Sequence, residues 1–347
     1  MLSVDKVESE PRIQLAEALS TQFENVDGIF RRKTAQGYWS NISKNAQDDL
    51  LDALERTDVQ EAIDTHIPTY QNFIYAPIRS EGLKLLDIQE NHVGIDYGCM
   101  WGNLLLAAAE KAQAMVGVDI TEEHLQFLKH RLREEGTENV LLVNHDLKEA
   151  FDLSDRFDFS IVNGVLEWVP FDPEAPATTD ADYDPRQVQL QFLRTVCQNL
   201  KQNGTLYLAI ENRYDYQYFL WKPDVHTRQM YTAFLPRSLA DIISRWTTGQ
   251  PYMNYIYSHR QLEQLLREAG FTQIEKYSAF PSYRYPGCIL PIDKRQRDRF
   301  TTYYHCAPTK NPLKRLFRGL RRRLDGLIFK KLGLMELAPA FIFIAKK

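Results

Sequence analysis

The feature of this sequence that most restricts its fold is a regular alternation of short apolar runs and helical segments from residue 92 onward. Strands buried on both faces of a parallel sheet have this continuous apolar character. The predicted strands are residues 92–98, 114–120, 139–146, 157–164, 204–212, 271–280 and 340–347. The predicted helices are residues 103–113, 122–136, 185–204 and 258–271, three of which end in the possible C-cap glycines Gly136, Gly204 and Gly270. The alternation predicts an α/β fold around a largely parallel sheet.

The rest of the chain divides into an N-terminal segment and two insertions. Residues 1–91 are polar, with apolar positions at helical spacing in 48–63, and they predict an N-terminal helical cap. Residues 92–347 then form one domain with insertions at about 213–258 and 281–339. Both insertions are dense in aromatic residues, so we expect them to build a substrate site.

Composition and charge exclude several classes of protein. A net charge of −4 and an isoelectric point near 6.1 argue against a nucleic-acid partner, because domains that bind nucleic acids are usually strongly basic. The four cysteines form no CxxC pair, so neither a metal site nor a redox motif is predicted, and reduced thiols favour a cytoplasmic location. No secretory signal and no apolar run long enough to cross a membrane is evident. The oligomeric state is not predicted.

Residues 93–103, VGIDYGCMWGN, carry the pattern of a strand that turns tightly into a helix around a ligand. Asp96 lies at the end of the apolar run, and Gly98 and Gly102 follow it four positions apart. Backbone N–H groups and a helix N-terminus are exposed at such a turn. Met100 stands where a loop that binds pyrophosphate needs another glycine. The loop therefore favours a ligand without phosphates over a nicotinamide dinucleotide, although a nicotinamide-dependent oxidoreductase is an alternative.

Acidic residues end three successive predicted strands: Asp96, Asp119 and Asp146. The carboxyl ends of parallel strands meet at one edge of a sheet, so these carboxylates are expected along one ligand crevice. Asp119 is placed to accept from the ribose hydroxyls of a nucleoside, and Asp146 from an exocyclic amine. A structural interpretation makes Asp96 and Asp146 ordinary turn or helix caps.

These residues resemble the class I S-adenosylmethionine-dependent methyltransferases. VGIDYGCMWG resembles the first motif of that family, VGVDI the second, VNHDL the third, FDFSIVNG the fourth strand and AFIFIAKK the final strand. The resemblance implies a Rossmann-like seven-stranded sheet with an antiparallel last strand, and S-adenosyl-L-methionine as the cofactor. It implies these cofactor-binding residues: Asp96, Gly98, Met100, Gly102, Asp119, Ile120, Asp146, Leu147 and Asn163. Asp96 would lie near the ammonium group, Asp119 would hold the ribose, and Ile120 and Leu147 would flank the adenine.

A narrower resemblance concerns the acceptor. NGVLEWVP, IENRYDYQYFL and FPSYRYPG are similar to segments of methyltransferases encoded beside glycosyltransferases for cell-surface polysaccharides. This resemblance implies a link to glycans. The predicted reaction is methyl transfer to an oxygen of a small molecule or glycan, with nitrogen as the second choice. A non-catalytic scaffold that binds the cofactor within a polysaccharide-assembly complex is the alternative.

An oxygen acceptor usually needs a general base, and positioning supplies much of the remaining acceleration. The candidate catalytic residues are Glu167, Glu211 and His226. The candidate substrate-binding residues are Arg213, Tyr214, Tyr218 and His259. Each has a structural alternative: Glu167 could orient its loop, Arg213 could pair with Glu211, and the histidines and tyrosines could pack.

Residues 311–331 form a basic segment with helical spacing of its apolar positions. Eight Lys and Arg side chains against Asp325 give this segment a charge of +7, which leaves −11 for the rest of the chain. A basic amphipathic helix suits peripheral contact with an anionic membrane surface, here the inner membrane surface. The strand that follows it directly favours the alternative, in which its apolar face packs on the protein's own sheet or on a second subunit.

Overall fold

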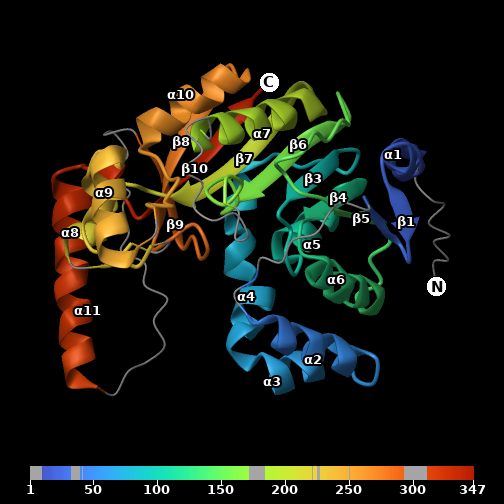
Figure 1. The fold of residues 1–347 in the computed structure, drawn as a ribbon, viewed down its shortest axis with the longest axis horizontal. Helices are drawn as coiled ribbons and strands as arrows, with labels where there is room; N and C mark the ends of the chain where they lie inside the picture. Colours follow the sequence, from blue (N-terminus) through green and yellow to red (C-terminus); the bar gives the residue numbers. More distant parts are fainter. Residues whose placement is uncertain are drawn as a thin grey trace. The chain divides into compact units, whose positions relative to one another are not determined.

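The computed structural model describes residues 10–32, 40, 42–171, 184–220, 222–224, 227–249, 251–292 and 311–347 (Figure 1). The chain divides into two compact units. The first unit comprises residues 1–162, 194–207 and 346–347, and the second comprises residues 163–193 and 208–345. The helix α7 (Pro185–Asn199) and the strand β7 (Leu200–Glu211) contribute residues to both units.

The first unit is built on parallel strands that are buried over most of their length. They are β3 (Val93–Tyr97), β4 (Ala114–Asp119), β5 (Val140–Asn144) and β6 (Phe157–Asn163). β3 lies between β4 and β6, with Tyr97 opposite Val118 on one side and Val162 on the other. This register brings the carboxyl ends of the three strands, where the predicted ligand residues lie, to one edge of the sheet.

A short segment of the predicted N-terminal helical cap, residues 1–91, forms strands instead of helix. β1 (Glu24–Val26) and β2 (Ile29–Arg31) form a hairpin, and β2 pairs in parallel with β5. Asp27 and Gly28 both adopt positive φ at the turn, at 54° and 86°. An Asp-Gly pair between short apolar runs is a strong hairpin signal, and here it adds two strands to the sheet.

The remaining helices of the first unit lie around this sheet. They are α1 (Glu10–Ser20), α2 (Lys44–Leu54), α3 (Val59–His66), α4 (Gln71–Tyr75), α5 (Asn103–Ala109) and α6 (Glu122–Glu134). Two 3₁₀ helices, Pro68–Tyr70 and Pro77–Leu85, flank α4. The helices α2 and α3 pack on α6, and their apolar residues share a core with Trp101 and Phe127 (Figure 1). The N-terminal helices are therefore anchored directly behind the loop that follows β3.

The second unit contains the C-terminal strands β8 (Gln273–Phe280), β9 (Cys288–Pro291) and β10 (Ala340–Lys346). Asn212 donates to Pro339 O, and Lys347 donates to Gly204 O, so β10 runs antiparallel to β7. β8 and β9 are antiparallel to each other. The order of the sheet is β1-β2-β5-β4-β3-β6-β7-β10-β8-β9. The sheet thus has ten strands rather than the predicted seven, because β1, β2 and β9 extend its edges.

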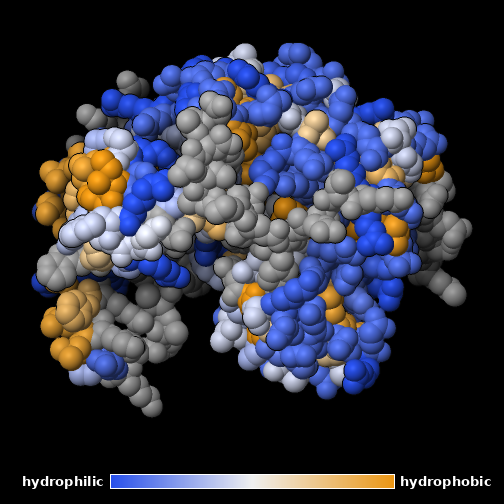
Figure 2. Space-filling view, in the orientation of Figure 1, coloured by the Kyte–Doolittle hydropathy of each residue, from blue (hydrophilic) through white to orange (hydrophobic). Residues whose placement is uncertain are grey.

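The helices of the second unit are α8 (Tyr216–Phe219), α9 (Arg237–Thr248), α10 (His259–Ala269) and α11 (Pro312–Asp325), with a 3₁₀ helix at Thr232–Phe234. α11 continues into a π-helical turn, Gly326–Lys331, and a 3₁₀ helix follows at Met335–Leu337. Figure 2 shows apolar residues gathered over α9 and along α11, on the left of the view. Among the described helices, none combines the length and the apolar character that crossing a bilayer requires.

Two of the three predicted glycine caps are present. Gly136 and Gly270 follow α6 and α10 with φ of 62° and 112°. Gly204 does not cap α7, because β7 begins at Leu200, directly after the helix ends. The predicted helix at residues 185–204 is therefore too long by its last turn.

Candidate functional site

The loop between β3 and α5 has the conformation of a tight strand-to-helix turn. Gly98, Met100 and Gly102 all have positive φ, at 74°, 48° and 82°. The N–H groups of Gly98 and Cys99 donate to Val118 O at 2.7 and 3.0 Å, which ties the loop to β4. Met100 thus adopts, with a side chain, a backbone conformation that glycine adopts more easily.

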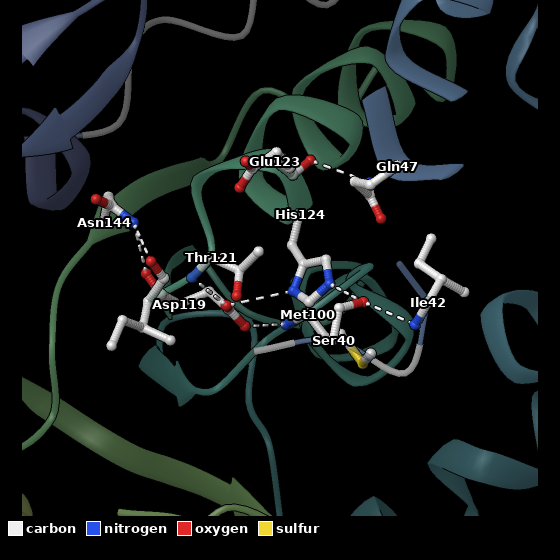
Figure 3. A network of polar contacts seen from close by, with 10 residues as sticks. Ser40, Ile42, Gln47, Met100, Asp119, Thr121, Glu123, His124 and Asn144 are labelled. Atoms are coloured by element: carbon white, nitrogen blue, oxygen red, sulfur yellow. Dashed lines mark hydrogen bonds and ion pairs between the residues drawn. The ribbon is translucent and has the colours of Figure 1, made fainter. Parts of the chain in front are cut away.

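Asp119, at the end of β4, holds this loop through its carboxylate (Figure 3). Its Oδ2 accepts from Met100 N at 2.8 Å, and its Oδ1 accepts from Thr121 N at 2.9 Å. The Nδ1 atom of His124 lies 3.4 Å from the same Oδ1. A carboxylate has about four acceptor positions, so Asp119 keeps capacity for a further donor such as a hydroxyl group.

A polar link connects Asp119 to the N-terminal segment. His124 is fully buried, and its Nε2 lies 3.0 Å from Ser40 Oγ (Figure 3). The ring of Trp101 packs edge-on against His124, with 5.4 Å between ring centroids. The loop and the N-terminal helices are therefore joined through one buried histidine and one buried tryptophan, neither of which was among the predicted site residues.

Asp96 is buried at the end of β3. Burial, and then the nearby charge of Asp119, raise the pKa of the Asp96 carboxyl group well above its ordinary value. A cationic group brought beside Asp96 would favour its ionised form. Such a carboxyl group is suited to meet an ammonium group.

Asp146, Ile120 and Leu147 lie half-buried after the ends of β4 and β5. Asp146 Oδ1 accepts from Lys148 N at 2.9 Å, and its Oδ2 lies 3.4 Å from Lys148 Nζ. Ile120 O accepts from the side chain of Asn144 at 2.8 Å. Asp146 therefore makes the turn contacts of the structural interpretation, and its partial exposure leaves its carboxylate accessible to a ligand.

The second unit contains a group of buried polar atoms that have no partner among the described residues. They are Asn163 Oδ1, Glu167 Oε1, Glu167 Oε2 and Glu211 Oε2. Glu167 follows the end of β6, and Glu211 ends β7. Burial, and then the charge of Glu211, raise the pKa of Glu167 well above its ordinary value. Two predicted catalytic residues are thus brought together, and with one of them protonated they can share a hydrogen bond, which leaves only part of their acceptor capacity for a ligand.

Arg284 and Tyr283 complete this carboxylate pair, and neither was among the predicted site residues. Arg284 Nη2 lies 3.6 Å from Glu211 Oε1, and Arg284 Nε donates to Tyr283 Oη at 3.1 Å. A Cβ atom on Gly164 would lie 2.2 Å from the Tyr283 hydroxyl oxygen, so only glycine leaves room for this ring. The sequence feature that could have identified Arg284 is its position within the aromatic segment FPSYRYPG, because an Arg among aromatic residues suits an anionic partner.

The other predicted substrate residues have structural partners. Arg213 donates to Ala233 O and Leu235 O at 2.8 and 2.5 Å, so its guanidinium group is held by backbone. Tyr218 is buried against Phe234, and burial raises its pKa. His259 packs against Phe341, and burial lowers its pKa. Tyr214 is half-buried beside the guanidinium group of Arg213. The predicted catalytic residue His226 lies outside the described residues.

A pocket of about 310 Å³ lies within the second unit. Its lining includes Arg213, Arg237, Tyr252, Tyr255 and Tyr257. Gln189 donates to Leu166 O at 2.8 Å and to Tyr255 O at 3.0 Å, which connects the pocket wall to the residue before Glu167. An aromatic pocket with polar groups at its wall suits a sugar or phenolic ligand.

In the parts of the chain that the structure describes, no three histidine, cysteine or carboxylate side chains gather as a metal site would require. The side chains that carry chemistry are therefore carboxylates and one arginine in the second unit, and carboxylates around a glycine-containing loop in the first.

Comparison with known proteins gives both structural and family matches. Phosphoethanolamine N-methyltransferase 2 from Haemonchus contortus, solved with S-adenosyl-L-methionine, has 15% identity and a TM-score of 0.45, over 89% of this chain and 61% of that chain. A SAM dependent methyltransferase from Archaeoglobus fulgidus has 14% identity and a TM-score of 0.42, over 82% of this chain and 100% of that chain. No curated protein matches the sequence. A family model described as a methyltransferase domain matches residues 88–270, which is more than half of the chain.

Proposed function

The chain belongs to the family of methyltransferase domains. We propose that it transfers the methyl group of S-adenosylmethionine to an oxygen of a small molecule or glycan. The pair formed by the buried Glu167 and the half-buried Glu211 carries this proposal. A hydroxyl acceptor must lose a proton as it attacks the methyl group, and a carboxylate with a raised pKa is suited to take it near neutral pH. Family membership favours this reaction over the nicotinamide-dependent alternative.

The proposed cofactor site is the loop after β3 together with the residues that end β4 and β5. Gly98, Met100 and Gly102 would pass beside the methionine part of the cofactor, and Asp96 would meet its ammonium group. Asp119 would accept from the ribose hydroxyls with the acceptor capacity that its contacts to Met100 and Thr121 leave. Ile120 and Leu147 would flank the adenine, Asp146 would accept from its amine, and Asn163 would lie near the methionine tail.

For the acceptor, we propose Glu167 and Glu211 as the groups that receive the proton, with Arg284 adjusting their charge. The aromatic pocket around Tyr255 and Tyr257 would hold the acceptor by stacking. The narrower sequence resemblance supports a glycan as this acceptor. The cytoplasmic location expected from the cysteine usage is part of the same proposal, supported by the free thiols of Cys99, Cys197 and Cys288.

Labelled S-adenosylmethionine offers the direct test. The purified chain would be incubated with the labelled donor and parallel panels of sugars, phenols and amines, and the methylated products identified. We expect O-methylated products, and a kcat lower by about 100-fold in Glu167→Gln with cofactor affinity unchanged. Glu275→Gln, an exposed carboxylate of the same unit, serves as the matched control and should behave as the native protein.

Two results would contradict the proposal. Methylation of the amines alone would show that the acceptor atom is nitrogen and not oxygen. Saturable binding of the cofactor without turnover of any acceptor, unchanged in both variants, would support the scaffold alternative.

A further inference from the structure

The helix α11 carries an apolar face that faces solvent. Leu313, Leu316, Phe317 and Leu320 follow at helical spacing, and their exposed fractions lie between 62% and 68%. An apolar face of this kind normally packs against another element of the same protein. Here these four side chains are exposed instead, and α11 lies outside the residues 88–270 that match the methyltransferase family. The exposed face therefore needs a partner that the family fold does not supply.

The same helical segment also carries exposed basic residues. Arg315, Arg322, Arg323, Lys330 and Lys331 are exposed, and the segment 311–331 has a net charge of +7 in a chain whose total is −4. A surface that combines exposed leucine and phenylalanine with concentrated positive charge complements a surface that is apolar beneath and negative outside. An anionic lipid bilayer has both properties.

The C-terminal end of the helix is fixed to the second unit. Tyr216 donates a short hydrogen bond from its hydroxyl to Asp325. Phe329 is fully buried between Tyr216 and Phe280, with ring centroids 5.4 and 4.7 Å away. These contacts hold one end of the helix, while its first three turns present the apolar face outward.

A second helix of the same unit repeats the pattern. Leu239, Ile242 and Trp246 are exposed on α9, and Trp246 has an exposed fraction of 86%. Figure 2 shows apolar residues over both α9 and α11 on the face in view. Tryptophan is enriched at the boundary between lipid headgroups and acyl chains, because its ring is apolar and its N–H is polar. A solvent-exposed tryptophan beside two exposed aliphatic residues fits that boundary.

We infer that α11, together with the exposed residues of α9, docks this protein on an anionic membrane surface. A second copy of the chain is a poorer occupant, because pairing two α11 helices would bring two segments of charge +7 together. RNA would use the basic residues but would leave the leucines unexplained, since phosphate contacts need no apolar face. This docking does not require methyl transfer, so its test is independent of the proposed reaction.

Vesicle co-sedimentation of the full chain tests the inference. We expect binding to vesicles of phosphatidylcholine with phosphatidylglycerol, weak binding to phosphatidylcholine alone, and release by salt. Leu316→Glu/Phe317→Glu should weaken the binding at least ~10-fold, because it places acids in the apolar face. Arg322→Gln/Arg323→Gln should weaken it by roughly fivefold for each charge removed. Ile13→Glu, an exposed apolar residue of α1, is the matched control and should bind normally.

Retained binding of S-adenosylhomocysteine in each variant would show that the fold is intact. Equal vesicle binding by the native protein and both α11 variants would overturn the inference. So would a native dimer that Leu316→Glu/Phe317→Glu converts to a monomer without any vesicle binding, since the face would then belong to a subunit interface. Binding to RNA that survives in Leu316→Glu/Phe317→Glu, without vesicle binding, would likewise overturn it.

Discussion

Arg284 places its guanidinium group 3.6 Å from a carboxylate oxygen of Glu211. Glu211 in turn lies beside the buried Glu167, whose pKa is raised first by burial and then by Glu211, while Arg284 opposes this rise. The three charges therefore set the pH at which Glu167 can accept a proton. The effects expected from substitutions of Arg284 and Glu167 follow from this relationship.

Replacing Arg284 by methionine should slow methyl transfer at neutral pH. Without the guanidinium group, the pKa of Glu167 rises further, so a smaller fraction of the carboxylate is ionised and able to act as a base. We expect the rate to fall by roughly 10- to 100-fold and the ascending limb of the pH–rate profile to move to higher pH. Arg284→Lys keeps the charge and should retain the native profile better. An unshifted profile in Arg284→Met would show that this arginine does not act through Glu167.

Glu167→Gln should make the protein more stable than the native form as the pH rises. The unfolded chain loses the Glu167 proton near the ordinary pKa of 4.5, whereas the folded protein retains it to higher pH. The folded state then binds more protons, so native stability falls as the pH rises from 4.5 toward the raised pKa. Glutamine carries no such proton. Urea unfolding from about pH 5 to about pH 8 measures the difference between the two proteins, which should grow with pH. A constant difference would mean that Glu167 ionises at its ordinary pKa in the fold.

Asp119→Asn should weaken cofactor binding more than Asp146→Asn. The native carboxylate accepts from Met100 N with one oxygen and from Thr121 N with the other. Asparagine has only one acceptor oxygen, so its NH₂ group would face one of these N–H donors and that hydrogen bond would be lost. Charge-assisted bonds of this kind contribute about 1.5–3 kcal/mol, so affinity for S-adenosylhomocysteine should fall roughly 10- to 100-fold. Asp146 accepts from one backbone N–H through Oδ1, which asparagine can replace, and its other contact is a partly exposed ion pair with Lys148 Nζ at 3.4 Å, which contributes little. Calorimetric titration of both folded variants gives the ranking, and equal losses would contradict it.

The strands of this fold were predictable where they are long and apolar. Each of the seven predicted strands is present. β3, β4 and β5 are buried along their whole length, and a strand buried on both faces has a continuous apolar sequence. β1 and β2 were not predicted, because a strand of three residues is too short to show an alternation of apolar and polar residues. The Asp27-Gly28 pair at their turn was nevertheless a hairpin signal in the sequence. The length of α7 was overestimated because Gly204 looked like a cap, whereas it lies within β7.

The residues of the candidate site that lie at the ends of strands were predictable. Asp96, Asp119 and Glu211 end or nearly end their strands, so the order of the chain places them at the sheet edge. The pairing of Arg284 with Glu211 depends on how an insertion returns across the second unit, and no local pattern encodes that contact. The exposure of α11 was not predicted: packing of its apolar stripe was favoured, whereas Leu313, Leu316, Phe317 and Leu320 are exposed. One apolar stripe is compatible with both packing and membrane contact.

Gly102→Ala should destabilise the protein more than Gly136→Ala. Both glycines have positive φ, so each alanine costs about 1 kcal/mol in backbone conformation. A Cβ atom on Gly102 would also lie 2.3 Å from Leu128 Cδ1, in a buried position that cannot yield freely, whereas one on Gly136 meets nothing within 4 Å. Overpacking adds about 1–3 kcal/mol, so we expect a total of about 2–4 kcal/mol for Gly102→Ala. Urea unfolding of the pair measures it, and equal losses would mean that Leu128 moves aside.

Met100 offers a test of the loop conformation that needs neither cofactor nor acceptor. A residue with a side chain is strained at the φ of 48° that Met100 adopts, and glycine is not. Glycine also has more conformational entropy in the unfolded chain, which offsets part of this advantage. The net expectation is that Met100→Gly is more stable than Met100→Ala by about 0.5–1 kcal/mol. Both variants lose the same contacts of the methionine side chain with the core around Trp101, so their difference isolates the backbone. The opposite order is expected at Gln14, an exposed helical position in α1, where glycine should be less stable than alanine by about 1 kcal/mol. Chemical denaturation of the four variants gives both differences. If alanine were the more stable residue at both positions, the loop would not hold residue 100 in the left-handed conformation.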